Sequence, residues 1–187
     1  MIEGIIKSSI EVKESLLKDT EIHKTILLVV DTICQSFQKG NRVMFCGNGG
    51  SAADAQHLAA ELSGRFYKDR KALPAEALHC NTSYLTAIAN DYDYDCVYSR
   101  LVDGVMNTGD VLIGISTSGN SKNIVKAFEV ANQKNITTIS LTGKDGGKLN
   151  NVSDYILKVP STDTPRIQES HILLGHIICE LVESKLF

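Results

Sequence analysis

The alternation of short apolar runs with helical patterns is the feature that most constrains the fold of this chain. Five runs are predicted as strands, at residues 43–46, 77–80, 111–115, 137–141 and 155–159, and a helical pattern follows each one. The runs at 111–115 and 136–141 are continuously rather than alternately apolar, which is typical of strands covered on both faces. With right-handed crossovers, such strands predict an α/β fold, a doubly wound five-stranded parallel sheet flanked by helices.

Residues 1–40 precede the first predicted strand and carry two apolar stripes at helical spacing. The first stripe is Ile2, Ile5, Ile6 and Ile10, and the second is Ile26, Val30, Ile33, Cys34 and Phe37, ending at Gly40. We predict an N-terminal extension of one or two amphipathic helices, which pack on the sheet domain or in an oligomer. No linker, low-complexity segment or charge block interrupts the sequence, so we expect a single domain over residues 1–187.

Composition excludes several classes of partner. The formal net charge is −3 and the hydrophobic content is 43%, so the chain has no basic surplus for nucleic acid or for an anionic membrane. Its five cysteines are scattered, form no CxxC pair and mostly have apolar neighbours, which favours buried free thiols over a disulfide framework or a zinc site. No apolar run reaches the roughly 18 residues that span a bilayer, and residues 1–19 lack the pattern of a signal peptide. We therefore expect a cytoplasmic protein.

Two loops that follow predicted strands contain small and hydroxylated residues. GNGGS begins at Gly47, and STSGNS begins at Ser116. In a parallel sheet both loops lie at the carboxyl edge, where backbone N–H groups and a helix N-terminus face a ligand and favour an anion. A tight turn with a helix N-cap explains either loop alone slightly better. Four hydroxyl groups within six residues nevertheless favour a phosphate at the second loop.

The glycines of the first loop do not indicate a nucleotide. GNGGSA fits the loose dinucleotide pattern G-x-G-x-x-A, but that pattern requires an acid at the end of the next strand, and the sequence there is LHCN. Neither loop contains the Gly-Lys-Ser/Thr element of a Walker loop. We therefore expect a small phosphorylated metabolite as ligand and no nucleotide cofactor.

Several titratable residues have more than one interpretation. His57 and Glu61 share a helix face, which by itself usually means a surface hydrogen bond. His176 has apolar neighbours, as a core histidine does. The tyrosines at 92, 94 and 98 follow Asp91, with Asp93 and Asp95 interleaved, which favours a solvated loop entering a helix over an aromatic binding platform.

Five segments, taken together, closely resemble the phosphoheptose isomerases of the sugar isomerase (SIS) superfamily. They are CGNGGSAADAQHLAAELSGR, AIAND, GISTSGNSKNIVKAF, SLTGKDGG and TPRIQESHILLGH. The resemblance runs from about residue 42 to the end, and it implies a flavodoxin-like SIS fold. It also implies an aldose–ketose isomerase that converts sedoheptulose 7-phosphate to D-glycero-D-manno-heptose 7-phosphate through a cis-enediol. The product is a precursor of nucleotide-activated heptose for bacterial lipopolysaccharide or capsule. The alternative is a non-catalytic SIS protein that binds a phosphosugar or associates with a replication initiator.

The resemblance also implies roles for individual residues. Glu61 and His176 match the catalytic carboxylate and histidine of the family. Its substrate-binding positions match Asn48, Gly49, Gly50, Glu61, Asn90, Asp91, Ser116, Thr117, Ser118, Ser121 and Gln168. In some members zinc is held at positions that match His57, Glu61, Gln168 and His176, an oxygen-rich set that favours weak or partial occupancy.

One feature of that ligand set constrains how it assembles. Gln168 and His176 are eight residues apart, about 12 Å along a continuous helix. They converge on one ion through long reach, through a helix that starts after Gln168, or through donation from different subunits. The last explanation agrees with the family, whose members are typically homotetramers with active sites at subunit interfaces.

Ketose–aldose isomerisation requires proton removal from the carbon beside a carbonyl and proton return to its neighbour. A carboxylate and an imidazole suit this chemistry, since each exchanges protons near neutral pH when its surroundings adjust its pKa. We therefore expect Glu61 to act as the base at C1 and His176 as the partner acid. A bound zinc ion would add a Lewis acid.

Overall fold

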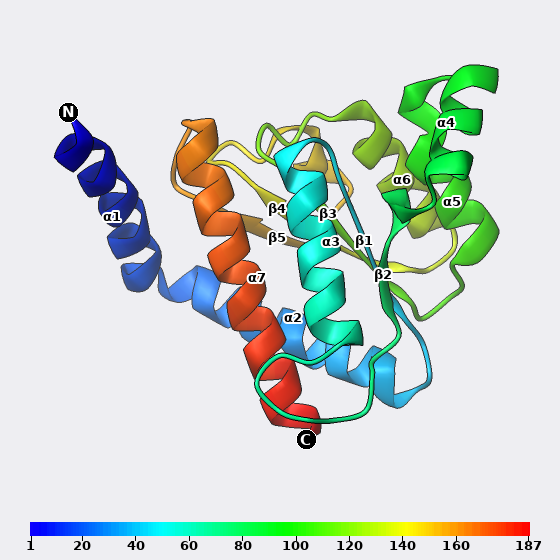
Figure 1. Ribbon diagram of the computed structural model, residues 1–187, viewed down its shortest axis with the longest axis horizontal. Coiled ribbons are helices and arrows are strands. Elements are labelled where there is room, and N and C mark those ends of the chain that lie inside the picture. The colour runs from blue at the N-terminus through cyan, green and yellow to red at the C-terminus, as the bar shows by residue number, and fades with distance from the viewer.

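The computed structural model describes all residues 1–187 and contains one parallel sheet with helices on both faces (Figure 1). Its strands are β1 (Val43–Gly47), β2 (Ala75–Ala77), β3 (Val111–Ser116), β4 (Thr137–Thr142) and β5 (Tyr155–Lys158). They lie in the order β2-β1-β3-β4-β5, and every neighbouring pair is parallel. The predicted doubly wound α/β sheet is confirmed, and its strand order reverses between β1 and β3.

Helices cover the two faces of the sheet in separate layers. The helices are α1 (Ile2–Lys18), α2 (Thr20–Gln38), α3 (Gly50–Ser63), α4 (Thr82–Asp91), α5 (Val97–Val105), α6 (Lys122–Gln133) and α7 (Thr164–Leu186). Val43 and Phe45 pack in the hydrophobic cluster of α2, α3 and α7, whereas Met44 and Cys46 pack in that of α5 and α6. Because successive strand side chains point to opposite faces, both sets of positions in β1 are apolar. This arrangement explains the continuous apolar runs in the sequence.

The second predicted strand is placed wrongly. We expected a strand at 77–80, but β2 ends at Ala77 and residues Leu78–Cys80 form a turn of 3-10 helix. β2 is an edge strand that pairs with β1 over three residues only. Leu78 is buried against the α5 and α6 layer, and the Asn81 side chain accepts a hydrogen bond from Tyr84 N at the start of α4. The apolar character of 77–80 therefore comes from a buried turn rather than from sheet pairing.

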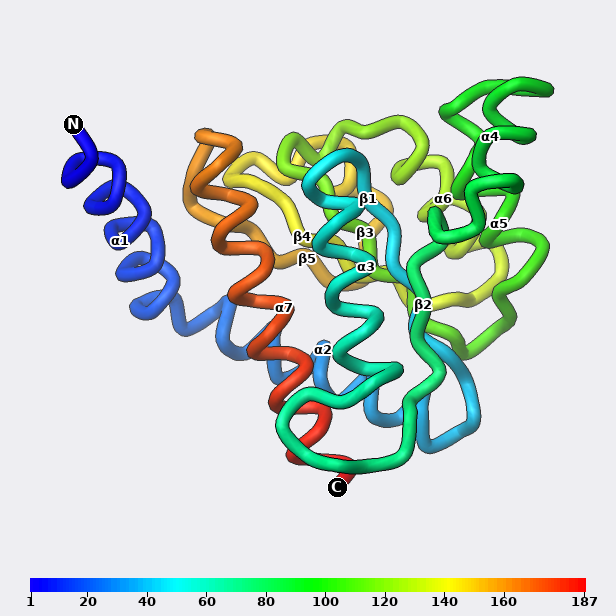
Figure 2. Tube along the Cα trace, in the orientation of Figure 1, coloured from blue at the N-terminus to red at the C-terminus, as the bar shows by residue number.

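The N-terminal extension consists of two helices. Asp19 separates them, because its carboxylate accepts hydrogen bonds from the N–H groups of Glu21 and Ile22 and so caps α2. α2 contacts β5 and α7, whereas α1 projects from the body beside the first turns of α7 (Figure 2). Leu16 is the only buried residue of α1.

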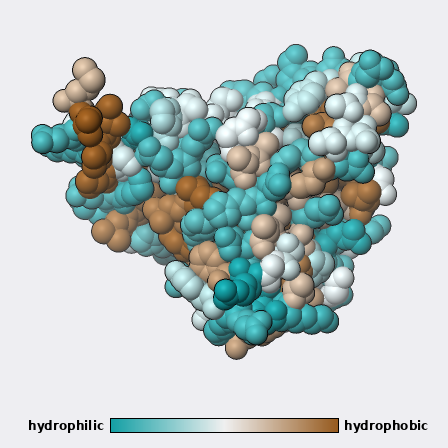
Figure 3. Space-filling model, in the orientation of Figure 1, coloured by the Kyte–Doolittle hydropathy of each residue, from teal (hydrophilic) through white to brown (hydrophobic).

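The projecting helix exposes an apolar surface. Ile2, Ile5, Ile6 and Ile10, which we call the α1 stripe, are all about half exposed or more. Figure 3 shows hydrophobic atoms gathered at the end of the molecule where α1 lies. All five cysteines are free, as predicted, and Cys34, Cys46 and Cys179 are also buried as predicted, whereas Cys80 is exposed and Cys96 is partly buried. None of the helices combines the length and the apolar character required to cross a membrane.

Candidate active site

The two loops singled out in the sequence lie side by side at the strand-order reversal. β1 and β3 are paired with Gly47 opposite Ile115, so their following loops leave the same edge of the sheet. We call residues 47–50 the glycine loop and residues 116–121 the serine loop. The glycine loop turns at Gly49, whose φ of 55° lies in the left-handed region, and α3 begins at the next residue. The serine loop leads directly into α6.

The serine loop offers unused hydrogen-bond donors. Ser116 Oγ and Ser121 Oγ lie 3.0 Å apart and share a hydrogen bond. Ser121 precedes α6 without a side-chain cap, and the N–H groups of Lys122 and Asn123 donate to no atom of the chain. These are unpaired donors of a helix N-terminus, where the helix dipole also favours negative charge. Hydroxyl groups and free N–H groups together make this loop suited to a phosphate.

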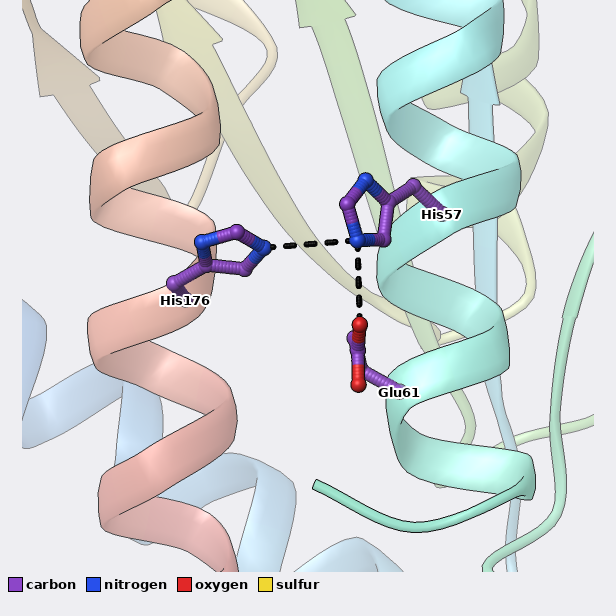
Figure 4. Close-up of side chains that lie close together, drawn as sticks. All are labelled: His57, Glu61 and His176. Carbon is purple, nitrogen blue, oxygen red and sulfur yellow. Dashed lines mark hydrogen bonds and ion pairs between the residues drawn. The ribbon is translucent and has the colours of Figure 1, made fainter. Parts of the chain in front are cut away.

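Three titratable side chains converge from α3 and α7 (Figure 4). His57 Nε2 lies 3.0 Å from Glu61 Oε1, and His176 Nε2 lies 3.4 Å from His57 Nε2. One possible ligand atom from each residue lies within 4.8 Å of the others. His57 is exposed, while Glu61 and His176 are partly buried, so His176 is not a core histidine. Two imidazole nitrogens and a carboxylate oxygen fit zinc as a donor set.

Gln168 occupies a different level of the same helix pair. A Cβ atom on Gly50 would lie 2.8 Å from Gln168 Nε2, so Gln168 lies against the first turn of α3. His57 follows Gly50 by seven residues, about 10 Å further along α3. α7 begins at Thr164, before Gln168, which rules out a helix that starts after it. One chain therefore gathers three of the four predicted ligands into a group, and Gln168 lies toward the glycine loop.

The predicted pair Asn90 and Asp91 lies at the end of α4. Both side chains are exposed, and Asn90 Nδ2 donates to Asp91 Oδ1 at 3.0 Å. The residues after them return to the site, where Tyr94 Oη donates to Asn48 Oδ1 at 3.4 Å and Lys122 pairs with Asp95 at 3.5 Å. The structure thus connects this segment to the glycine loop and to the start of α6.

The tyrosine segment was only partly predicted. Tyr92 and Tyr94 are exposed, as expected of a solvated loop, but Tyr98 is 1% exposed and its hydroxyl donates to Gly47 O. Tyr98 shares the buried face of α5 with Leu101 and Val102, and this helical spacing is the signal that identifies it. Tyr98 therefore supports the backbone at the beginning of the glycine loop.

A buried ion pair fixes the other end of α3. Glu183 accepts hydrogen bonds from the N–H groups of Phe66, Tyr67 and Lys68 and from Arg70 Nε, at 2.7 to 3.1 Å. Arg70 also donates to the carbonyl oxygens of Glu61 and Leu62. The Phe66 ring centroid lies 5.7 Å from that of His176. The Arg70–Glu183 pair therefore holds the backbone of Glu61 and the segment that places the Phe66 ring beside His176. No local sequence pattern predicts this pair, because its members are 113 residues apart.

Three groups around the site have pKa values shifted by their surroundings. Burial by itself would raise the pKa of Glu183, but the three backbone N–H groups and Arg70 lower it to about 2. Burial raises the pKa of Asp54, one turn before His57, and the positive charge of His57 and His176 opposes that rise. His171, whose side chain is fully buried, has a pKa lowered to about 4 by burial. It is therefore neutral near pH 7.

The sequence and the fold of the chain are both similar to those of known proteins. The family model described as SIS domain matches residues 9–143. A phosphoheptose isomerase from Clostridium acetobutylicum is 55% identical over 186 residues, which cover 100% of this chain and 95% of the relative. A solved phosphoheptose isomerase from Neisseria gonorrhoeae superposes with a TM-score of 0.92 at 41% identity, covering 98% of this chain and 97% of that one. For a phosphoheptose isomerase from Francisella tularensis, the TM-score is 0.93 at 33% identity, with 98% and 96% covered.

Proposed function

The chain belongs to the phosphoheptose isomerases of the SIS domain family, and we propose that it converts sedoheptulose 7-phosphate to D-glycero-D-manno-heptose 7-phosphate. The product serves as a precursor of nucleotide-activated heptose for lipopolysaccharide or capsule. The observation that carries the proposal is the convergence of His57, Glu61 and His176 from two helices, in a chain that also contains a phosphate-type loop. A scaffold that only binds a phosphosugar has no evident need for this acid–base group.

The substrate extends between the two loops. Its phosphate binds the serine loop through the hydroxyls of Ser116, Thr117, Ser118 and Ser121 and the free N–H groups of α6. The sugar then lies along the glycine loop, within reach of Gln168 and the segment that carries Asn90 and Asp91. Such contacts on a remote phosphate hold the reacting carbons in position without taking part in the chemistry.

Proton transfer falls to Glu61 and His176. The Glu61 carboxylate removes a proton from C1 of the ketose, and the resulting cis-enediol receives a proton at C2. The His176 imidazole acts as the partner acid, because an imidazole can both donate and accept a proton. The Phe66 ring beside His176 excludes water from one side of this imidazole. The Arg70 and Glu183 pair keeps Glu61 in place through its carbonyl oxygen.

The residues present fit a zinc ion. His57, Glu61 and His176 would hold it, with Gln168 donated by a neighbouring subunit as a fourth ligand, and a bound zinc ion would supply a Lewis acid that polarises the carbonyl and stabilises enediolate charge. The oxygen-rich set favours weak or partial occupancy.

We further propose that the single domain of residues 1–187 works as a homotetramer in the cytoplasm, with active sites shared between subunits. The exposed α1 stripe supports assembly, because an apolar surface of this kind is stabilised by burial against another helix. The place of Gln168, near the glycine loop rather than with the other three ligands, supports donation between subunits. Five free cysteines support a reducing compartment.

Turnover of sedoheptulose 7-phosphate, followed by NMR, tests the proposal. The wild-type chain should form the aldose phosphate, with or without added zinc. Glu61→Gln should lose turnover and retain phosphosugar binding, while Glu180→Gln, an exposed change on α7, should behave as wild type. Binding without any aldose in all zinc conditions would leave only the non-catalytic alternative.

A further inference from the structure

An amide pair joins the glycine loop to the first turn of α6. Asn48 Nδ2 donates to Asn123 Oδ1 at 3.0 Å, and Asn123 Nδ2 donates to Asn48 Oδ1 at 2.9 Å. The two residues are 75 positions apart in the sequence, and Asn123 is 3% exposed. This reciprocal pair is the only side-chain hydrogen bonding between the two ligand loops and their helices.

The pair uses most of the hydrogen-bonding capacity of Asn48. Its Oδ1 accepts from Asn123 and, at 3.4 Å, from Tyr94 Oη, so both lone pairs of this oxygen are occupied. Its Nδ2 has one hydrogen committed to Asn123. Asn123 is fixed in turn, because its Oδ1 also accepts from the N–H of Ile124 within α6. The oxygen of the Asn48 side chain therefore has no capacity left for the sugar, and one hydrogen on Nδ2 is its only free hydrogen-bonding group.

We propose that the Asn48–Asn123 pair is a clamp that sets the spacing between the glycine loop and the serine loop, with Asn123 as an unassigned positioning residue. The proposal rests on the proposed function, since a phosphosugar is the ligand that spans both loops. It changes the predicted role of Asn48 from direct sugar contact to loop positioning. Backbone N–H groups of the glycine loop then contact the sugar.

Loss of the clamp should weaken substrate binding more than it slows the chemical step. α3 packs along α7 independently of the clamp. Gly50 of α3 lies against Gln168 of α7, and Leu58 of α3 lies against Gly175 of α7. Arg70 holds the end of α3 through the carbonyl oxygen of Glu61. Glu61 therefore stays in place when the pair is removed. The serine loop is held by β3 and by the Ser116 to Ser121 bond, so the phosphate subsite also persists. Removing the pair therefore leaves each subsite intact but no longer fixes the distance between the glycine loop and the serine loop.

The test is a double-mutant cycle of Asn48→Ala and Asn123→Ala. Loss of two amide hydrogen bonds predicts that KM for sedoheptulose 7-phosphate rises about tenfold in each single variant, with kcat within about twofold of wild type. The double variant should be no worse than either single one, because both remove the same clamp. Inhibition by inorganic phosphate, which needs only the serine loop, should change less than about twofold.

Asn132→Ala is the matched control. It also removes an asparagine of α6 whose amide bonds another segment, at Val152 O, but it lies away from both loops. Hydrogen exchange of the amides at 49–52 should accelerate in the two clamp variants and remain unchanged in this control, whatever the substrate. Additive losses in the double variant, or unchanged exchange at 49–52, would overturn the clamp. Lack of turnover by the wild type, with the exchange response intact, would instead overturn the proposed function.

Discussion

Glu183→Gln removes the charge that organises the end of α3. The wild-type carboxylate has a pKa of about 2, against 4.5 for an ordinary glutamate, and a difference of about 2.5 units corresponds to about 3 kcal/mol of stability at neutral pH. The side chains of Arg70 and Glu183 are 2% and 3% exposed, so solvent screens this interaction little. The variant also leaves Arg70 buried without its counter-charge, and we expect a total loss of about 3 to 5 kcal/mol.

The pH dependence follows from the depressed pKa. Stability from Glu183 is fully present above the unfolded-state pKa of 4.5 and is lost as pH falls toward the folded-state value of about 2. By pH 3 the contribution should be about 1.4 kcal/mol, so the gap between wild type and variant should shrink by about 2 kcal/mol relative to pH 7.

Urea unfolding at pH 7 and pH 3, at one fixed protein concentration, measures both quantities. Glu180→Gln, an exposed change on the same helix, should stay within about 0.5 kcal/mol of wild type at both pH values. A loss below about 1 kcal/mol at pH 7, or an equal loss at pH 7 and pH 3, would refute the reasoning.

Three further changes have defined outcomes. Between pH 6.5 and pH 4 the wild type should lose about 3 kcal/mol of unfolding free energy, because the imidazole of His171 takes up a proton in the unfolded state but not in the folded state. His171→Leu should remove this loss. Urea unfolding midpoints across the pH range measure it, and parallel pH profiles for the two proteins would contradict it. Asp54→Asn should raise the melting temperature of the metal-free protein, because Asp54 Oδ2 is buried without a partner and asparagine removes the charge that burial disfavours. A lower melting temperature would contradict this reasoning. Ile6→Asp should shift the protein toward smaller oligomers in analytical ultracentrifugation, because it places a charge in the α1 stripe; an unchanged assembly would exclude the stripe as an interface.

The sheet was predictable because its signals are local. β1 and β3 carry continuous apolar runs, whereas β4 alternates Ile139 and Leu141 with buried threonines and a serine. The alternation of the strands with helices indicates a parallel order. β2 was misplaced because an edge strand of three residues has little pattern of its own, while the buried Leu78 beside it imitates one. The break between α1 and α2 depends on one capping carboxylate, at Asp19.

The sequence predicted the parts of the site that depend on residue type and local spacing. His57 and Glu61 share a helix face by spacing alone, but their meeting with His176 depends on α3 and α7 lying side by side, which no local pattern states. The contacts of Arg70 with Glu183 and of Asn48 with Asn123 were missed for the same reason. Each joins segments that only the folded sheet brings together.

Isomerisation in deuterated water tests the central claim most directly. If Glu61 and His176 move protons through a cis-enediol, the aldose phosphate formed from sedoheptulose 7-phosphate should carry deuterium at C2, and Glu61→Gln should abolish both product and label while still binding the phosphosugar. Aldose formed without solvent deuterium, or labelled product at the wild-type rate from Glu61→Gln, would contradict the account.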